Sequence, residues 1–412
     1  MKHRSSQSIG LRGAYRRARV PLKVRMKVKG RVEAMIVNPD GQIAQKVEGD
    51  NLVLNQGLDG IATRKWCDTF LYCAAGSNGT PTSDSSGATQ ASQSGTTVTL
   101  TGGAVVFADP ADIGKVIKWN SGPTARIVSI TSTTSAEVDE TQTVASGLFT
   151  IYRTNQTSLG TEIQRTNNYL TGIANCGTSR SGNVFSHKRT FDFPVESGSV
   201  TYREIGFSHA SGAGANLFSR IKLSTDLTLV ASQVLRVVYT LQLTVSPDTP
   251  VGKAANILGW PIAPSTTVDG DEQIQYFGLS GVNTSGATVA LDDGGYVNEP
   301  SEETTAYAFL STVTTSPAAF GSATNRTGTT PAQQVVELDD YVSLSYSIDK
   351  VTTFDVDEAL STVWRTIGLG RKESSFESYV SNTFVFVFDQ NQTKDELHTL
   401  ELRFTYTWNR EL

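Results

Sequence analysis

The chain has 412 residues, enough for two or three domains that each bury a core of their own. Hydrophobic residues make up 38% of it and charged residues only 18%, which excludes a disordered tail or a coiled coil and favours a β-rich globular protein. No apolar run is long enough to cross a bilayer, and no apolar segment typical of a signal peptide follows the N-terminal charges. We therefore expect neither membrane insertion nor secretion through a signal peptide.

Positive charge is concentrated at the N-terminus. The segment from Lys2 to Arg31 holds 11 Lys and Arg residues, and the first acidic residue of the chain is Glu33. Subtracting these 11 cations from the net charge of -5 leaves the rest of the chain near -16. An asymmetry of this size indicates a partner or an opposing surface. The candidate partner-binding residues are the cations Arg4, Arg12, Arg16, Arg17, Arg19, Lys23, Arg25, Lys27 and Lys29.

Residues 22–29, LKVRMKVK, alternate apolar and basic side chains, which predicts a half-buried strand with one wholly basic face. Residues 1–21 have no apolar periodicity, and we expect them to form an extended basic arm. Three interpretations stay open: docking on an acidic neighbouring subunit, such as another copy of the chain; contact with nucleic acid, although no nucleic-acid-binding motif accompanies the charge; or simple solvation. An organelle transit peptide is a minor fourth alternative.

Residues 32–53 are expected to form a hairpin, because Pro39 and Gly41 in the sequence NPDG favour a tight turn. The next residues change to a helical period. Leu58 and Ile61 fall on one side of a short helix that Asn55 is placed to cap. Residues 76–95 carry almost no apolar side chains, so we expect a loop or linker there.

Residues 96–153 contain short apolar runs separated by turn sequences, the pattern of a small antiparallel barrel or sandwich. The polar segments on its two sides have the same character. This favours a small domain, residues 94–155, inserted into a surface loop of a host domain. Within it, Trp119 beside a turn is the best candidate for a contact with a glycan, although a core position suits it better.

Two long segments have nearly the same sequence: LRVVYTL at 235–241 and LRFTYTW at 402–408. Upstream of them, YREIGFS at 202–208 corresponds to WRTIGLG at 364–370. We interpret the repeat as an internal duplication. It predicts two related antiparallel β-sandwich units, or one larger sandwich with pseudo-twofold symmetry.

The expected fold is therefore all-β and has four parts. These are a basic N-terminal arm (1–21), a first β-sandwich (22–93 and 156–250), an inserted small β-barrel or sandwich (94–155) and a second β-sandwich (251–412).

The order of these segments resembles a known family. NLVLNQGLDGIA, GSNGTPTS, TSLGTEIQRTNNY, VTYREIGFSHA and VLRVVYTLQL follow one another in a way that is similar to tailed-phage virion structural proteins of the tail, collar or appendage type. The block VVFADPADIGKVIKW with ARIVSITSTTSAEVD resembles small β-domains that decorate such proteins. The resemblance covers most of residues 32–246, and it implies a non-enzymatic assembly component without catalytic residues.

No motif predicts catalysis, a metal site or a cofactor. The four histidines have no ligands at metal-binding spacing and are expected at the surface or in loops. The acidic clusters at 292–295 and 355–358 do not match a calcium loop and are expected to be solvated turns. The three cysteines are expected to be reduced and mostly buried.

The leading hypothesis is a non-enzymatic structural component of a phage virion that oligomerises and contacts copies of itself and other virion proteins. Such a protein would be located in the virion after assembly in the host cytoplasm, without a membrane partner. A receptor- or glycan-binding module of a tail fibre or spike, which contacts the host surface through its loops, is the first alternative. A tail-associated hydrolase is the second, and it would need a cleft with paired carboxylates.

Overall fold

The computed structural model describes residues 16–63, 70–170, 175–181, 184–214 and 216–247, and then the segments 306–311, 332–335, 337–338, 342–355, 363–372, 380–393 and 398–412. Strands dominate these segments, and α1 (Asn55–Thr63) is the one α-helix within them. The expected all-β class is confirmed. The acidic cluster at 292–295 lies outside the described residues.

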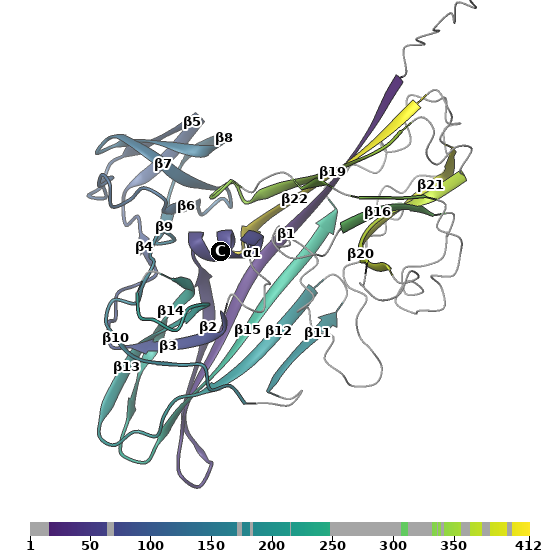
Figure 1. The fold of residues 1–412 in the computed structure, drawn as a ribbon. Helices are drawn as coiled ribbons and strands as arrows, with labels where there is room; N and C mark the ends of the chain where they lie inside the picture. Colours follow the sequence, from purple (N-terminus) through teal and green to yellow (C-terminus); the bar gives the residue numbers. More distant parts are fainter. Residues whose placement is uncertain are drawn as a thin grey trace, which may run out of the picture.

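The strands form three sheets (Figure 1). The largest has the order β10 (Glu162–Thr166), β3 (Tyr72–Gly76), β13 (Val200–Ser208), β14 (Leu217–Leu229), β2 (Ile43–Val53), β1 (Arg16–Val37), β15 (Val234–Pro247), β12 (Val184–Asp192) and β11 (Cys176–Ser181). From β1 it branches into β22 (His398–Arg410), β19 (Ser347–Phe354) and β18 (Glu337–Leu338). A four-stranded sheet has the order β17 (Ala332–Val335), β16 (Ala306–Ser311), β20 (Val363–Lys372) and β21 (Val380–Thr393). A six-stranded sheet has the order β4 (Ser83–Ser85), β9 (Phe149–Tyr152), β6 (Val116–Trp119), β7 (Thr124–Ser132), β8 (Ser135–Gly147) and β5 (Gln90–Thr101).

Strand β1 holds the large sheet together. Its residues 24–37 pair with β15 and its residues 30–37 pair with β2, both in antiparallel fashion. Its residues 16–28 pair with β22, and this ladder is parallel. The N-terminal arm, predicted at residues 1–21, is therefore shorter than expected. Residues 16–21 belong to β1, because β22 supplies backbone hydrogen-bonding groups opposite them. The rest of the arm, residues 1–15, lies outside the described residues.

The hairpin expected at residues 32–53 is present as β1, a turn and β2. Gly41 has a φ of 82°, which the turn requires and glycine tolerates. The N–H of Gly41 donates to the carbonyl of Asn38, and Asp40 accepts the N–H of Gln42 at 2.9 Å. The turn predicted from NPDG is therefore confirmed.

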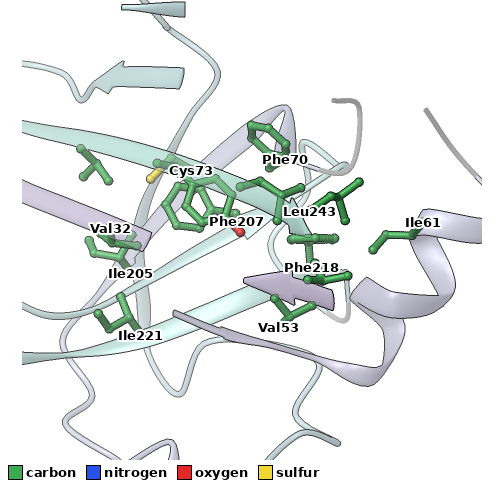
Figure 2. Packing of buried hydrophobic residues seen from close by; sticks show 14 of the residues in the cluster. Val32, Val53, Ile61, Phe70, Cys73, Ile205, Phe207, Phe218, Ile221 and Leu243 are labelled. Carbon is green, nitrogen blue, oxygen red and sulfur yellow. The ribbon is translucent and has the colours of Figure 1, made fainter. Parts of the chain in front are cut away.

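The large sheet folds over, so that β13 faces β15 and β12 across a common core. Phe207 of β13 stacks on Tyr239 of β15 with ring centroids 3.9 Å apart, and it lies 6.0 Å from the ring of Phe191 on β12. Figure 2 shows Phe207 among the buried side chains of this cluster, with Ile61 of α1 at its edge. The packing is sandwich-like, as the all-β prediction requires.

Both repeated strands bury the face that the alternation predicts, and both lie against β1. The buried residues are Leu235, Val237, Tyr239, Leu241 and Leu243 in β15, and Leu400, Leu402, Phe404, Tyr406 and Trp408 in β22. Glu401 of β22 is also buried.

The six-stranded sheet, β4 to β9, has its own hydrophobic core, and we call it the six-stranded unit. It lies in the chain between β3 and β10, which pair with each other. It begins earlier than expected: β4 and the start of β5 fall within residues 76–95, where we predicted a loop. Ala91 and Gln93 are buried there, because the Ala91 carbonyl accepts the indole N–H of Trp119 at 2.9 Å and Gln93 donates to the Glu140 carbonyl at 2.5 Å.

A buried ion pair ties both ends of this unit to the large sheet. Nε of Arg220 on β14 donates to Oε2 of Glu204 on β13 at 2.9 Å, and neither side chain is exposed. The same guanidinium donates to the carbonyl of Thr80, before the unit, and to Oε1 of Gln156, after it, both at 2.6 Å. Oε1 of Glu204 accepts the N–H of Thr161 at 3.1 Å. The pair therefore fixes where the chain leaves the large sheet and where it returns.

Arg220→Met should lower the free energy of unfolding by about 3–5 kcal/mol, because it leaves the carboxylate of Glu204 buried without a counter-charge. Arg203→Met is the matched control. Arg203 pairs with Asp226 across the same two strands, but both side chains are about half exposed. Its loss should cost less than about 1 kcal/mol. Urea denaturation measures both variants, and equal losses would contradict this account.

Candidate functional site

The basic face of β1 is the candidate functional site, and the predicted alternation is present. Met26 and Val28 are buried in the core of the large sheet. Arg25 and Lys27 point the other way and are exposed, and Lys29 is half-buried. The alternation that buries the apolar side chains therefore also displays the cations.

Acidic residues neutralise the C-terminal part of this face. Lys29 lies 3.3 Å from a carboxylate oxygen of Asp50 on β2 and 3.4 Å from one of Glu411. Burial alone would lower the pKa of Lys29, but the hydrogen bonds and charges of Asp50 and Glu411 outweigh it and raise that pKa. Arg31 pairs with Glu48 of β2 at 3.1 Å. The hairpin partner β2 thus supplies acids from Lys29 onward.

Toward the N-terminus, the next cations on this face are Lys27 and Arg25. Among the described residues, Lys27 has no ion pair. Arg25 lies near Glu140 of the six-stranded unit. Burial and the neighbouring Asp139 raise the pKa of Glu140, and Arg25 partly opposes them. The six-stranded unit therefore approaches the basic face at Arg25 and leaves Lys27 open to solvent.

The other predicted cations are placed as follows. The backbone of Arg16, Arg17, Arg19 and Lys23 lies in β1, opposite residues of β22. Arg4 and Arg12 lie outside the described residues. The structure thus brings seven of the nine predicted residues onto one strand, Arg16, Arg17, Arg19, Lys23, Arg25, Lys27 and Lys29.

Asn55 does not cap α1 as predicted. Its amide Nδ2 donates to the Gly114 carbonyl of the six-stranded unit at 2.7 Å, and its Oδ1 accepts from Nη2 of Arg410 at 2.7 Å. The backbone N–H of Asn55 donates to the carbonyl of Thr154, and the N–H groups of Gly57 and Leu58 donate to the carbonyl of Leu54. Asn55 therefore links the helix, the six-stranded unit and the end of β22, which lie together near the C-terminus in Figure 1.

Arg126 is a second link between the six-stranded unit and the rest of the chain. It pairs with Asp139 at 3.0 Å, donates to the Leu344 carbonyl at 3.0 Å and lies 5.4 Å from the ring centroid of Tyr346. Asp59 of α1 accepts the N–H of Leu344 at 2.7 Å. We call Asn55, Arg126, Tyr346 and Arg410, with these partners, the junction.

The junction is tightly packed. Leu344 and Tyr346 have φ values of 67° and 49°, which residues other than glycine rarely adopt. The turn therefore depends on the contacts that hold it. Burial lowers the pKa of Arg410 to about 10, although the nearby Tyr346 opposes that shift. No sequence pattern predicted the junction, because its members lie far apart in the chain.

Trp119 occupies the core position that suited it better than a glycan contact, because it is buried in the core of the six-stranded unit. One sequence-based interpretation is corrected. His187, expected at the surface or in a loop, is buried on β12 with its ring 5.2 Å from that of Phe70. Cys73 is a buried free thiol, as expected, and burial raises its pKa. Cys176 is free as well and half-buried, whereas Cys67 lies outside the described residues.

Comparisons with known proteins add no relative. No protein-family model, curated protein or solved structure matches the chain. Within the described segments, no group of His, Cys, Asp and Glu is arranged to hold a metal ion. In the same segments no helix has both the length and the apolar character needed to cross a membrane.

Arg126→Met should loosen the turn at residues 342–346 and lower the free energy of unfolding by about 1–3 kcal/mol, since charge-assisted hydrogen bonds are lost. Hydrogen exchange at the N–H of Leu344 and protease cleavage within the turn should both accelerate.

Arg153→Met is the control for this prediction. Arg153 pairs with Asp84 at 2.8 Å within the six-stranded region and makes no contact with the turn among the interactions described. Equal exchange rates at Leu344 in the two variants would show that Arg126 does not hold the turn.

Proposed function

We propose that the chain is a non-enzymatic structural component of a tailed-phage virion, of the tail, collar or appendage type, that oligomerises and contacts neighbouring virion proteins. The order of its sequence motifs supports this proposal by resemblance. The all-β architecture suits a protein that acts through its surfaces. The proposal places the chain in the virion, with copies of itself and other virion proteins as partners.

The observation that carries the proposal is Lys27, which is exposed on the basic face of β1 and has no ion pair among the described residues. Lys29 and Arg31, by contrast, are matched by the acids of β2 and by Glu411. The surplus continues toward the N-terminus, where residues 1–25 contain no acidic side chain. Since the rest of the chain is strongly acidic, an acidic surface on a second copy is the natural counterpart.

We also propose that the two halves of the chain arose by internal duplication. The strand order β10-β3-β13-β14 in the first half corresponds to β17-β16-β20-β21 in the second, and β15-β12-β11 corresponds to β22-β19-β18. The hairpins β13–β14 and β20–β21 carry register shifts at the same positions of the repeated sequence: Tyr202/Glu204 and Phe207/Ser208 in one, Trp364/Thr366 and Leu369/Gly370 in the other. Bulges persist within families, so their coincidence supports a common origin.

The six-stranded unit fits an insertion into the first copy. It follows β3 and precedes β10, and its counterpart position in the second half lies between β16 and β17. Because β3 and β10 are paired neighbours, the two ends of the inserted segment start close together. The buried pair of Glu204 and Arg220 then holds both ends to the host.

Deleting residues 1–15 should abolish assembly and leave the fold intact, because β1 begins at Arg16. Deleting residues 1–21 should also destabilise the monomer, since residues 398–403 of β22 would lose their partners in β1. Size exclusion reports assembly, and thermal unfolding followed by circular dichroism reports stability. If the shorter deletion assembled like the full chain, the basic segment would have no part in oligomerisation.

Lys27→Glu should weaken self-association several-fold at low salt, a change of about 1 kcal/mol per contact, because it reverses an exposed charge on the proposed interface. Lys222→Glu on β14 alters the net charge equally at an exposed position away from β1 and is the control. Sedimentation velocity compares the two variants. The same weakening in both would indicate an effect of net charge alone.

A further inference from the structure

Arg189 of β12 is a buried cation that has no acidic partner among the described residues. It faces the interior of the large sheet, as do His187 and Phe191 of the same strand, and it lies opposite Tyr239 of β15. The residue is only 6% exposed. Across the segments that the structure describes, no carboxylate forms an ion pair with it.

The described part of the chain makes three contacts with its guanidinium. Nη1 donates to the carbonyl of Phe70 at 3.2 Å, while Nε is buried and has no hydrogen-bond partner. The guanidinium carbon lies 5.0 Å from the ring centroid of Phe70 and 5.2 Å from that of Tyr169. Aromatic rings therefore cover the planar group, and the Nε side is left without an acceptor.

Arg220 of β14, which is also buried, has a hydrogen-bond partner for each of its three nitrogens. Arg220 donates from Nε to Glu204, from one terminal nitrogen to Gln156 and from the other to Thr80. Burying a cation without such partners costs several kcal/mol, and contacts with aromatic rings return about 2 kcal/mol at most. Among the described residues, therefore, no acidic group balances the charge of Arg189.

We propose that Arg189 is the centre of a binding site for a small oxyanion, a carboxylate or a phosphate group. The ring contacts at Phe70 and Tyr169 leave the edge of the guanidinium for a ligand, and its Nε–H is placed to donate a hydrogen bond to one oxygen of a bidentate oxyanion. Tyr169 is 39% exposed, so its ring forms the solvent side of the site. An oxyanion that enters beside Tyr169 supplies the missing counter-charge.

Thermal unfolding tests the site with two probes, sodium phosphate and sodium acetate, each titrated through the millimolar range at constant ionic strength set by sodium chloride. The full chain should show a saturable rise in Tm with at least one probe. Arg189→Met should remove that rise and, without the probe, should be at least as stable as the natural chain, because an unpaired buried charge is gone. A response to phosphate alone identifies a phosphate group as the ligand, and a response to acetate identifies a carboxylate.

Two further variants keep the test decisive. Arg203→Met removes an exposed, paired arginine of the same sheet and should leave the rise unchanged. Arg189→Lys keeps the charge without the planar fork and should raise the half-saturating concentration about tenfold, even if the Met variant does not fold. No response of the full chain to either probe, or an undiminished response in Arg189→Lys or Arg189→Met, would overturn the proposal.

Discussion

Strand β1 is the constraint on which the rest of the molecule depends. Its backbone pairs with β15, β2 and β22, so that one strand near the N-terminus joins the long C-terminal strands of both halves. The ladder with β22 brings Arg16 beside His398, a contact between nearly opposite ends of the chain. Contacts so distant in sequence carry a large loop-closure entropy, and they form late unless the partner strands are already in place.

The same alternation serves both the fold and the proposed function. Because Met26 and Val28 face the core, Arg25 and Lys27 face outward. A shift of the register by one residue would remove both the buried apolar face and the exposed basic face. Strand β2 then supplies acidic partners for Lys29 and Arg31 of β1. The six-stranded unit, which the junction holds, places Glu140 near Arg25.

Patterns of period two predicted much of this fold, since they record which side of a strand meets the core. The basic face of β1 was predicted in this way, whereas the turn residues of NPDG predicted the hairpin. The same alternation occurs in β15 and β22, where it sets the buried faces. The start of strand β5 was not predicted, because its buried positions there are the small Ala91 and the polar Gln93. Their hydrogen-bond partners, Trp119 and Glu140, lie far away in the sequence. Asn55 and Arg189 were missed for a related reason: their roles depend on partners that only the tertiary structure brings near them.

Solution mass by light scattering after size exclusion, at low and at high salt, tests the central claim most directly. A basic strand that meets an acidic surface on another copy predicts a discrete oligomer or filament at low salt, and a smaller mass when salt screens the charges. A monomer at both salt concentrations, for the full-length chain, would contradict self-assembly through the basic face of β1.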